Sequence, residues 1–293
     1  MFADHARRRA PHMPPARRAF AILLACGALC GCDRGGSSAS AGKGAVATDA
    51  DVKVVEDRSL PVATYVERGV PAIDHPWSAA DYGRAAEALQ QIALNDPALL
   101  PRAGSAASGP LFARMAGPEA FAALDKEDEG LMARVGLGVD AMESVPRVFA
   151  LYIEPMAKGR SLDVEAVAFE ALLLRLTARV VDVAEQARAA IPTEDPNREA
   201  RVAGFNQMRR GAASSFEAGL ATLGERNVYR RAELVKLVAA LEETLPPTLK
   251  ALLPEARRDL PSRIRKMAAD EKDPDIKAAL ERLSAALPAA ATP

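Results

Sequence analysis

Histidine and cysteine are scarce in this 293-residue chain, and their positions exclude most of the common catalytic and metal-binding chemistry. The histidines are residues 5, 12 and 75, and the cysteines are Cys26, Cys30 and Cys32. A zinc site needs three or four ligands, mostly His and Cys, di-iron bundles use Glu-x-x-His pairs on helices, and a Ser or Cys nucleophile needs a basic partner such as histidine. Beyond residue 32 only His75 remains for these roles. We therefore predict no metal, no cofactor and no catalytic residue of these kinds.

Aromatic residues make up 4% of the chain, and Trp77 is its single tryptophan. So few aromatic side chains argue against a ligand cage and against a platform on which nucleic-acid bases stack. Sustained alternation of apolar and polar residues is also missing between residues 78 and 287, where apolar residues recur at helical spacing instead. We therefore predict an all-α fold and no nucleic-acid partner.

A short apolar run near the N-terminus leads to the cysteines. Arg17 and Arg18 precede this run, which extends from Ala19 to Leu29. A basic segment, a short apolar run and small residues before a cleavage site are the layout of a secretory signal. The run is too short to span a bilayer as a helix.

This segment resembles the signal peptides of bacterial lipoproteins, whose lipobox places an aliphatic residue three positions before a cysteine. The stretch "LCGC" ends at Cys32 and "LLAC" ends at Cys26, so two registers compete. Cys32 is favoured because about ten apolar residues then precede the cut, against about six for Cys26. The resemblance implies a diacylglyceryl thioether on Cys32, cleavage before it and acylation of the new amine. Two or three acyl chains hold a protein stably on a membrane.

The lipobox thus predicts a protein of the bacterial cell envelope, anchored by its N-terminal lipid to the inner or the outer membrane. The alternatives are a plain secretory signal with incidental cysteines and a twin-arginine signal in "ARRAF". Without residues 1–31 the chain has 33 basic and 38 acidic residues, a net charge of −5. This mild acidity again argues against a general nucleic-acid binder, which would be basic.

Composition divides the chain into three parts. Residues 1–31 are the predicted signal peptide, and residues 32–60, rich in Gly, Ser and Ala at their start, are a predicted flexible tether. About 28 residues of such a chain span about 30 Å on average. Residues 61–293 form the predicted helical domain, with a sub-boundary near residues 225–245 as an alternative division.

The helical domain is predicted to be an irregular multi-helix bundle built around one long antiparallel hairpin. Apolar residues recur three or four apart over residues 162–191 and again over 195–223, and a loop of about five residues joins the two segments. So short a loop between long helices forces them to run antiparallel. Ser78 and Asp81 form a capping-box pair that predicts the start of the first long helix.

Other predicted helices contain glycines or begin at prolines. Gly136 and Gly138 lie in a helix predicted over residues 129–142, where they suggest close packing against a neighbour, and Pro146 starts or kinks the next helix. In the C-terminal part, each of three prolines is predicted to begin a short helix, and a fourth opens the last one. These prolines are Pro247, Pro254, Pro261 and Pro274.

Few residues stand out as candidates for a site. His75 and Trp77 precede the first long helix and are weak candidates for a ligand-binding lip, although packing of Trp77 under that helix explains the tryptophan equally well. Ser105 and Ser108 lie in a Gly- and Pro-bounded loop, where turn and N-cap duties are the expected roles. Four glutamates are candidates for a carboxylate metal site, although such residues on helices are usually solvated. They are Glu143, Glu154, Glu165 and Glu170.

One basic cluster lies in the C-terminal part, and it is a weak candidate for contact with anionic lipid headgroups or an acidic wall polymer. Its members are Arg257, Arg258, Arg263, Arg265 and Lys266, with acidic residues interspersed. The sequence as a whole therefore predicts a lipid-anchored, non-catalytic envelope protein that presents a helical surface to another envelope protein or a cell-wall polymer. A carboxylate-based envelope hydrolase and a small-ligand carrier with a pocket between helices are the alternatives.

Overall fold

The computed structural model describes residue 49, residues 52–94, 96–117 and 130–287, and the single residues 120, 121 and 124. Within these residues the chain forms nine α-helices, one short 3-10 helix and one isolated bridge between extended residues. The all-α prediction is therefore confirmed.

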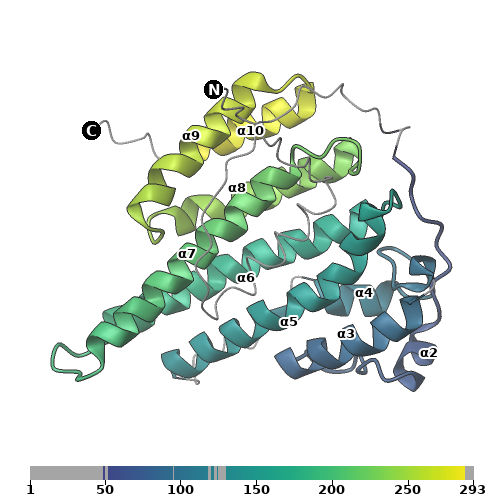
Figure 1. Cartoon of the computed structure of the whole chain (residues 1–293), viewed down its shortest axis with the longest axis horizontal. Helices are drawn as coiled ribbons and strands as arrows, with labels where there is room; N and C mark the ends of the chain where they lie inside the picture. Colours follow the sequence, from purple (N-terminus) through teal and green to yellow (C-terminus); the bar gives the residue numbers. More distant parts are fainter. Residues whose placement is uncertain are drawn as a thin grey trace, which may run out of the picture.

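The helices form a stepped stack. Six of them lie side by side in the order α3, α5, α6, α8, α10 and α9, while α7 packs beside α6 (Figure 1). Their bounds are α2 Val62–Glu67, α3 Ala79–Ala93, η2 Pro97–Leu99, α4 Gly109–Ala116, α5 Leu131–Ala157, α6 Asp163–Ala189, α7 Arg198–Thr222, α8 Arg231–Leu249, α9 Pro254–Asp270 and α10 Pro274–Ala286.

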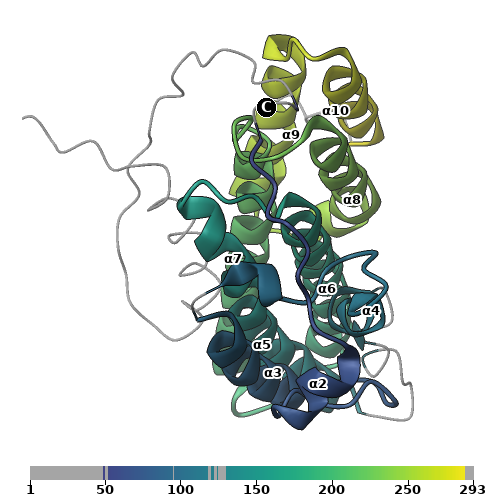
Figure 2. The same cartoon turned by 90° about the vertical axis from the view of Figure 1, so that its right-hand side faces the viewer.

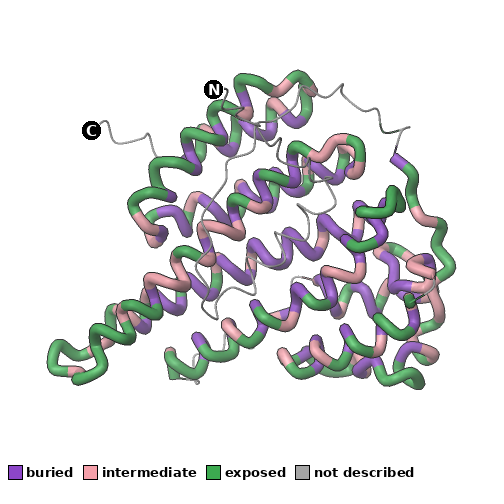
Figure 3. The backbone as a smooth tube through the Cα atoms, viewed as in Figure 1, coloured by how far each residue is buried: buried purple, intermediate pink, exposed green. Residues whose placement is uncertain are grey.

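One hydrophobic core runs through the stack, with members from Tyr65 to Leu287. Buried residues line the inner sides of the helices, and exposed residues cover the outer sides (Figure 3). Near its centre the ring of Phe169 in α6 meets Tyr152 of α5 at 5.2 Å and Phe112 of α4 at 5.6 Å between centroids. The core continues across residues 225–245, so a sub-boundary there does not separate two cores.

The long antiparallel hairpin is confirmed as α6 and α7. Its second helix begins at Arg198, three residues after the predicted start, because residues 190–197 form turns instead. There the Asp195 carboxylate accepts a hydrogen bond from the Asn197 backbone N–H at 2.7 Å and pairs with Arg201. A separate apolar cluster of Val135, Val183, Ala184, Ala187 and Phe205 holds the far end of the hairpin against α5.

Two predicted helix starts are confirmed by their capping contacts. Ser78 Oγ accepts the Asp81 N–H, and Asp81 in turn accepts the Ser78 N–H at 2.8 Å, which completes a capping box at α3. Pro274 opens α10, where Asp273 Oδ1 accepts the N–H groups of Asp275 and Ile276. Caps of this kind stabilise a helix by about 1 kcal/mol.

The proline prediction is correct for Pro254, which begins α9, and wrong for Pro247 and Pro261. Pro247 lies in the last turn of α8, and Pro261 lies in the middle of α9. Proline in a helix removes one backbone hydrogen bond and costs about 3 kcal/mol. Pro261 is buried in the interface of α9, where ring packing offsets that cost. Pro146 is likewise buried, and the single helix α5 continues through it.

Close packing explains one of the glycines in α5. A Cβ atom built on Gly138 would lie 2.5 Å from Val180 Cγ2 of α6, whereas the same atom on Gly136 would meet nothing within 4 Å. The glycine interpretation is therefore confirmed for Gly138 alone. Of the short helices predicted over 108–116 and 118–126, the first is α4, and most of the second lies outside the described residues.

The prediction of a flexible tether over residues 32–60 is wrong for residues 52–60, because these residues are hydrogen-bonded to the helical domain. This segment, here called the strap, runs along one side of the stack to α2 (Figure 2). Val54 forms a parallel bridge with Ser161, and Val55 N–H donates to Ser161 O at 2.9 Å. Val52 is buried, so the strap also contributes apolar packing. Residues 50 and 51 and all of residues 1–48 lie outside the described part of the chain.

Candidate functional site

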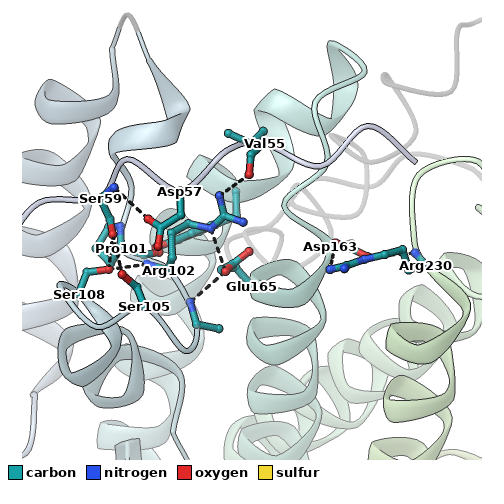
Figure 4. Close-up of polar contacts among 12 residues, drawn as sticks. Val55, Asp57, Ser59, Pro101, Arg102, Ser105, Ser108, Asp163, Glu165 and Arg230 are labelled. Atoms are coloured by element: carbon teal, nitrogen blue, oxygen red, sulfur yellow. Dashed lines mark hydrogen bonds and ion pairs between the residues drawn. The ribbon is translucent and has the colours of Figure 1, made fainter. Parts of the chain in front are cut away.

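The strap is held at its centre by a buried ion pair between Arg102 and Glu165. Arg102 Nε donates to Glu165 Oε1 at 3.0 Å, and the exposed fractions of the two side chains are 9% and 2%. Arg102 Nη1 also donates to the Val55 carbonyl at 2.9 Å, and the Ala103 N–H donates to the same glutamate oxygen (Figure 4). The pair thus joins the strap to the loop before α4 and to the first turn of α6.

A cluster of serine hydroxyls continues this network. Ser108 Oγ donates to Ser59 Oγ at 2.8 Å and accepts the Arg102 N–H, and Ser59 Oγ lies 3.1 Å from Ser105 Oγ (Figure 4). Burial acts to raise the pKa of Asp57, but hydrogen bonds from Ser59 and Ser105 outweigh it and lower that pKa. The described neighbours supply no histidine or lysine to activate a hydroxyl. The predicted turn role is confirmed for Ser105, whose Oγ accepts the Ala107 N–H. The predicted capping role is wrong for the Ser108 side chain, which makes no capping hydrogen bond at α4 and binds Ser59 of the strap instead.

A second ion pair with a buried carboxylate joins the start of α8 to the start of α6. Arg230 donates from Nε and Nη2 to the two carboxylate oxygens of Asp163, at 2.8 and 2.9 Å (Figure 4). The side chain of the next residue, Arg231, forms ion pairs with Asp273 and Asp275 at the α9–α10 turn. The backbone N–H of Arg231 donates to Asp49 Oδ1 at 2.7 Å. The chain that leads into the strap therefore meets the domain where α8, α9 and α10 come together.

His75 and Trp77 do not share one open surface. Trp77 is only 4% exposed, its Nε1 donates to the Ala72 carbonyl at 2.8 Å, and its ring meets Tyr82 edge-on. The His75 side chain is 51% exposed and hydrogen-bonds to Asp74. The tryptophan thus packs under α3, as the alternative interpretation of this pair has it.

The four glutamates of the considered metal site are also separated. Glu143 and Glu154 are exposed, whereas Glu165 and Glu170 are buried. Glu165 already binds Arg102, and Glu170 accepts a hydrogen bond from Thr222 Oγ1 at 2.9 Å. Among the residues that the structure describes, no group of three or more His, Cys, Asp or Glu side chains is arranged to hold a metal ion.

Glu170 is nevertheless unusual, because none of the described Lys, Arg or His side chains pairs with this buried carboxyl group. Its Oε2 atom is buried without a hydrogen bond to any described group. Burial raises the pKa of Glu170 to about 8, against the smaller opposite effect of the Thr222 hydrogen bond. A carboxyl group in such surroundings is largely protonated at neutral pH, when it can donate as well as accept a hydrogen bond.

A half-open groove of about 500 Å³ lies between α6 and α8. Its floor is apolar and contains Phe121, Leu124, Leu172, Leu176, Val181, Pro247 and Ala251. Its rim is charged and contains Arg175, Arg179, Asp182, Glu185, Glu243 and Lys250. Arg175 and Glu243 connect the two helices by hydrogen bonds of 2.8 to 3.1 Å. Concave apolar surfaces with a few polar groups are the usual form of binding sites.

The five basic residues of the predicted cluster all lie on α9, and all are exposed. They are Arg257, Arg258, Arg263, Arg265 and Lys266, here called the basic face. Among the described residues none of the five has an ion pair or a side-chain hydrogen bond, in contrast to Arg226 and Arg231, whose charges are paired with Glu271 and with Asp273 and Asp275.

Three features were not predicted: the strap, the Arg102–Glu165 pair and the groove. The strap had one signal in the sequence, since Val52, Val54 and Val55 interrupt the Gly- and Ser-rich composition with β-branched residues. The ion pair joins residues 63 positions apart, and the groove depends on the packing of two helices, so neither leaves a local pattern.

Cys26 and Cys32 lie outside the described residues, so the structure does not test the predicted anchor. Over the part of the chain that is described, none of the helices combines the length and the apolar run that crossing a bilayer requires. Comparison of the chain with protein-family models, with curated proteins and with solved structures gave no match in any of the three cases.

Proposed function

We propose that this chain is a lipid-anchored protein of the bacterial envelope that presents its helical surface to a partner there. The observation that carries the proposal is the lipobox "LCGC" at residues 29–32. The position of Asp49 supports it, because only 16 residues separate Cys32 from the first described contact with the domain. A chain of that length is short for a domain but sufficient for a membrane tether of about 20–25 Å.

The anchor is tested by comparing two cysteine variants of the full chain expressed in a bacterial host. Cys32→Ser should abolish labelling by palmitate and move the protein from the detergent phase to the aqueous phase. Cys26→Ser is the matched control, because it removes the competing lipobox and leaves "LCGC" intact. The opposite result would assign the lipid to Cys26, and labelling of neither cysteine in the parent chain would overturn the proposal.

The groove between α6 and α8 is the surface that we assign to the partner. Its apolar floor and charged rim suit a segment of another envelope protein better than a strongly charged wall polymer, which would find few free cations there. A photo-crosslinker at Pro247, which is exposed in the groove, should form one specific adduct in intact cells. The same group at the exposed Ala203 of α7 should form none. Equal adducts from both positions would contradict the assignment.

A second candidate function, a carrier of a small ligand, is supported by the volume of the same groove. About 500 Å³ is within the range of ligand sites. Native mass spectrometry of the purified protein distinguishes the two functions. A bound small molecule that Pro247→Trp displaces would favour the carrier, and an unliganded protein that forms the crosslinked adduct would favour the partner surface.

A further inference from the structure

The basic face of α9 stands out because its charges are unpaired. In the described part of the chain, seven arginines have neither an ion pair nor a side-chain hydrogen bond. Four of them belong to α9, and the other three, Arg68, Arg160 and Arg198, lie far apart in the sequence. Unpaired cations concentrated on one helix form an electrostatic surface, whereas scattered ones do not.

The helical positions of these residues direct them away from the core. Leu260, Ile264 and Ala268 recur every four residues and are buried. Arg258 and Arg265 are seven residues apart, which places them about 10 Å apart on one side of the helix. Lys266 extends that side, and the exposed Ser262 lies within it. The outer side of α9 is exposed along its length (Figure 3).

The charge of α9 has the opposite sign to that of the chain around it. The helix contains five basic residues and three acidic ones, Glu255, Asp259 and Asp270, for a net charge of +2. The chain from residue 32 onward has a net charge of −5. Helix α7 has the same net charge of +2, but three of its four arginines, Arg201, Arg209 and Arg210, are bound to neighbouring side chains. The unpaired charges of α9 are free to meet an anionic surface, where each Lys or Arg contributes about 1 kcal/mol.

The chain from the predicted anchor enters the fold beside one end of α9. Asp49 accepts the N–H of Arg231, and the side chain of Arg231 pairs with Asp273 and Asp275, directly after α9 ends at Asp270. Sixteen residues lie between Cys32 and Asp49, and a flexible chain of that length would span about 20–25 Å. This span is close to the roughly 25 Å length of α9 itself. The anchor thus confines the basic face within a few nanometres of the bilayer.

We infer that the basic face of α9 docks on the anionic phospholipid headgroups of the membrane that holds the lipid anchor. The inference rests on the proposed function, since the anchor supplies the proximity. Headgroups are favoured over a wall polymer because they are held at a fixed short distance, which raises their effective concentration at α9. Docking would hold the stack in one orientation on the membrane.

The test uses the processed, lipidated protein with a fluorescent label on Ser262→Cys. Cys26 and Cys30 precede the predicted cut and the Cys32 thiol is acylated, so this label has a single attachment site. The protein is reconstituted in vesicles of phosphatidylcholine alone or with phosphatidylglycerol, and quenching by iodide from the water is measured. We expect the label to be protected only in the phosphatidylglycerol vesicles and to become accessible at high salt.

Substitution of Arg258, Arg265 and Lys266 by glutamine should remove this protection and shift the docked-to-free ratio by roughly a hundredfold. The matched control replaces Arg68, Arg160 and Arg198 by glutamine, which changes the net charge equally and should leave the protection unchanged. A label on Ala203→Cys should stay accessible in both kinds of vesicle.

The failures are distinguishable. A protein that does not float with phosphatidylcholine vesicles has no anchor, which overturns the proposed function and this inference together. A protein that floats with both kinds of vesicle, with equal quenching at residue 262, overturns the inference alone. Protection by soluble peptidoglycan fragments, without protection by phosphatidylglycerol, would assign the basic face to the wall and also overturn it.

Discussion

Gly138 of α5 packs directly against Val180 of α6, so closely that a Cβ atom on Gly138 would lie 2.5 Å from Val180 Cγ2. That distance is below any normal carbon–carbon contact. The two helices can therefore keep their present separation only with glycine at this position.

Gly138→Ala is expected to lower the free energy of unfolding by about 1–3 kcal/mol, because the helices must separate or Val180 must leave its rotamer. Gly136→Ala is the matched control, since it lies two residues away in open space and should raise the stability by up to about 1 kcal/mol. Chemical denaturation followed by circular dichroism measures both. A stabilising Gly138→Ala would contradict the packing interpretation.

The Arg102–Glu165 pair should be far more sensitive to substitution than the ion pairs on the surface. Arg102→Met leaves the Glu165 carboxylate buried without a cation and is expected to cost about 3–5 kcal/mol. Arg175→Met, which breaks an exposed pair with Glu243, should cost at most about 1 kcal/mol. Adding Glu165→Gln to Arg102→Met should recover part of the loss, and strictly additive effects of the two substitutions would show that they are not coupled.

Glu170 predicts an unusual dependence of stability on pH. Its pKa in the folded protein is about 8, above the ordinary value of 4.5 for the unfolded chain, so the folded state binds this proton more tightly. The stabilisation that this provides is complete below about pH 4.5 and is lost as the pH rises through 8. Glu170→Gln should therefore stabilise the protein by a few kcal/mol at pH 9 and have little effect at pH 4.

Glu185 provides the control of opposite sign. Burial acts to raise its pKa, but the side chains of Arg209 and Arg188 outweigh it and lower the pKa. The stabilisation from Glu185 is therefore present above the unfolded pKa and is lost as the pH falls through the folded value. Glu185→Gln should destabilise the protein at neutral pH and lose that effect in acid. Parallel pH profiles for the two variants would contradict both assignments.

The strap can be released by a single proline. Val55→Pro removes the N–H that donates to Ser161 O, and trypsin should then cleave after Arg58 at least several times faster than in the parent chain. Val54→Pro is the matched control, because the N–H of the 45% exposed Val54 donates no hydrogen bond to a described residue, the bridge being made by the Val55 N–H and the Lys53 carbonyl. Equal cleavage of the two variants would show that the Ser161 contact does not hold the strap.

The fold could be predicted largely because its signals are local. Caps such as Ser78 with Asp81 and apolar residues at helical spacing in α6 act within a few residues, so the sequence displays them directly. Pro261 misled the prediction because its cost in helix geometry is local, whereas the burial that offsets this cost comes from other helices. Tertiary packing thus overrides the low helix propensity of proline at this position, as tertiary context commonly does.

The candidate site was less predictable for the same physical reason. The basic face could be listed from the sequence, but its lack of partners depends on where Glu271, Asp273 and Asp275 are placed, and these pair with Arg226 and Arg231 instead. The groove depends on the separation of α6 and α8, which no local pattern records.

For the proposed anchored form of the protein, the strap limits how far the groove can move from the membrane. The tether expected from the sequence has about 28 residues, whereas only 16 lie between Cys32 and Asp49. A flexible chain of 16 residues has a mean extension about a quarter smaller than one of 28, because extension grows as the square root of length. The volume that the groove can reach around each anchoring point would then be about two fifths as large. Encounters would be concentrated in a thin layer above the bilayer, and proteins deeper in the envelope would be met only when they extend into it.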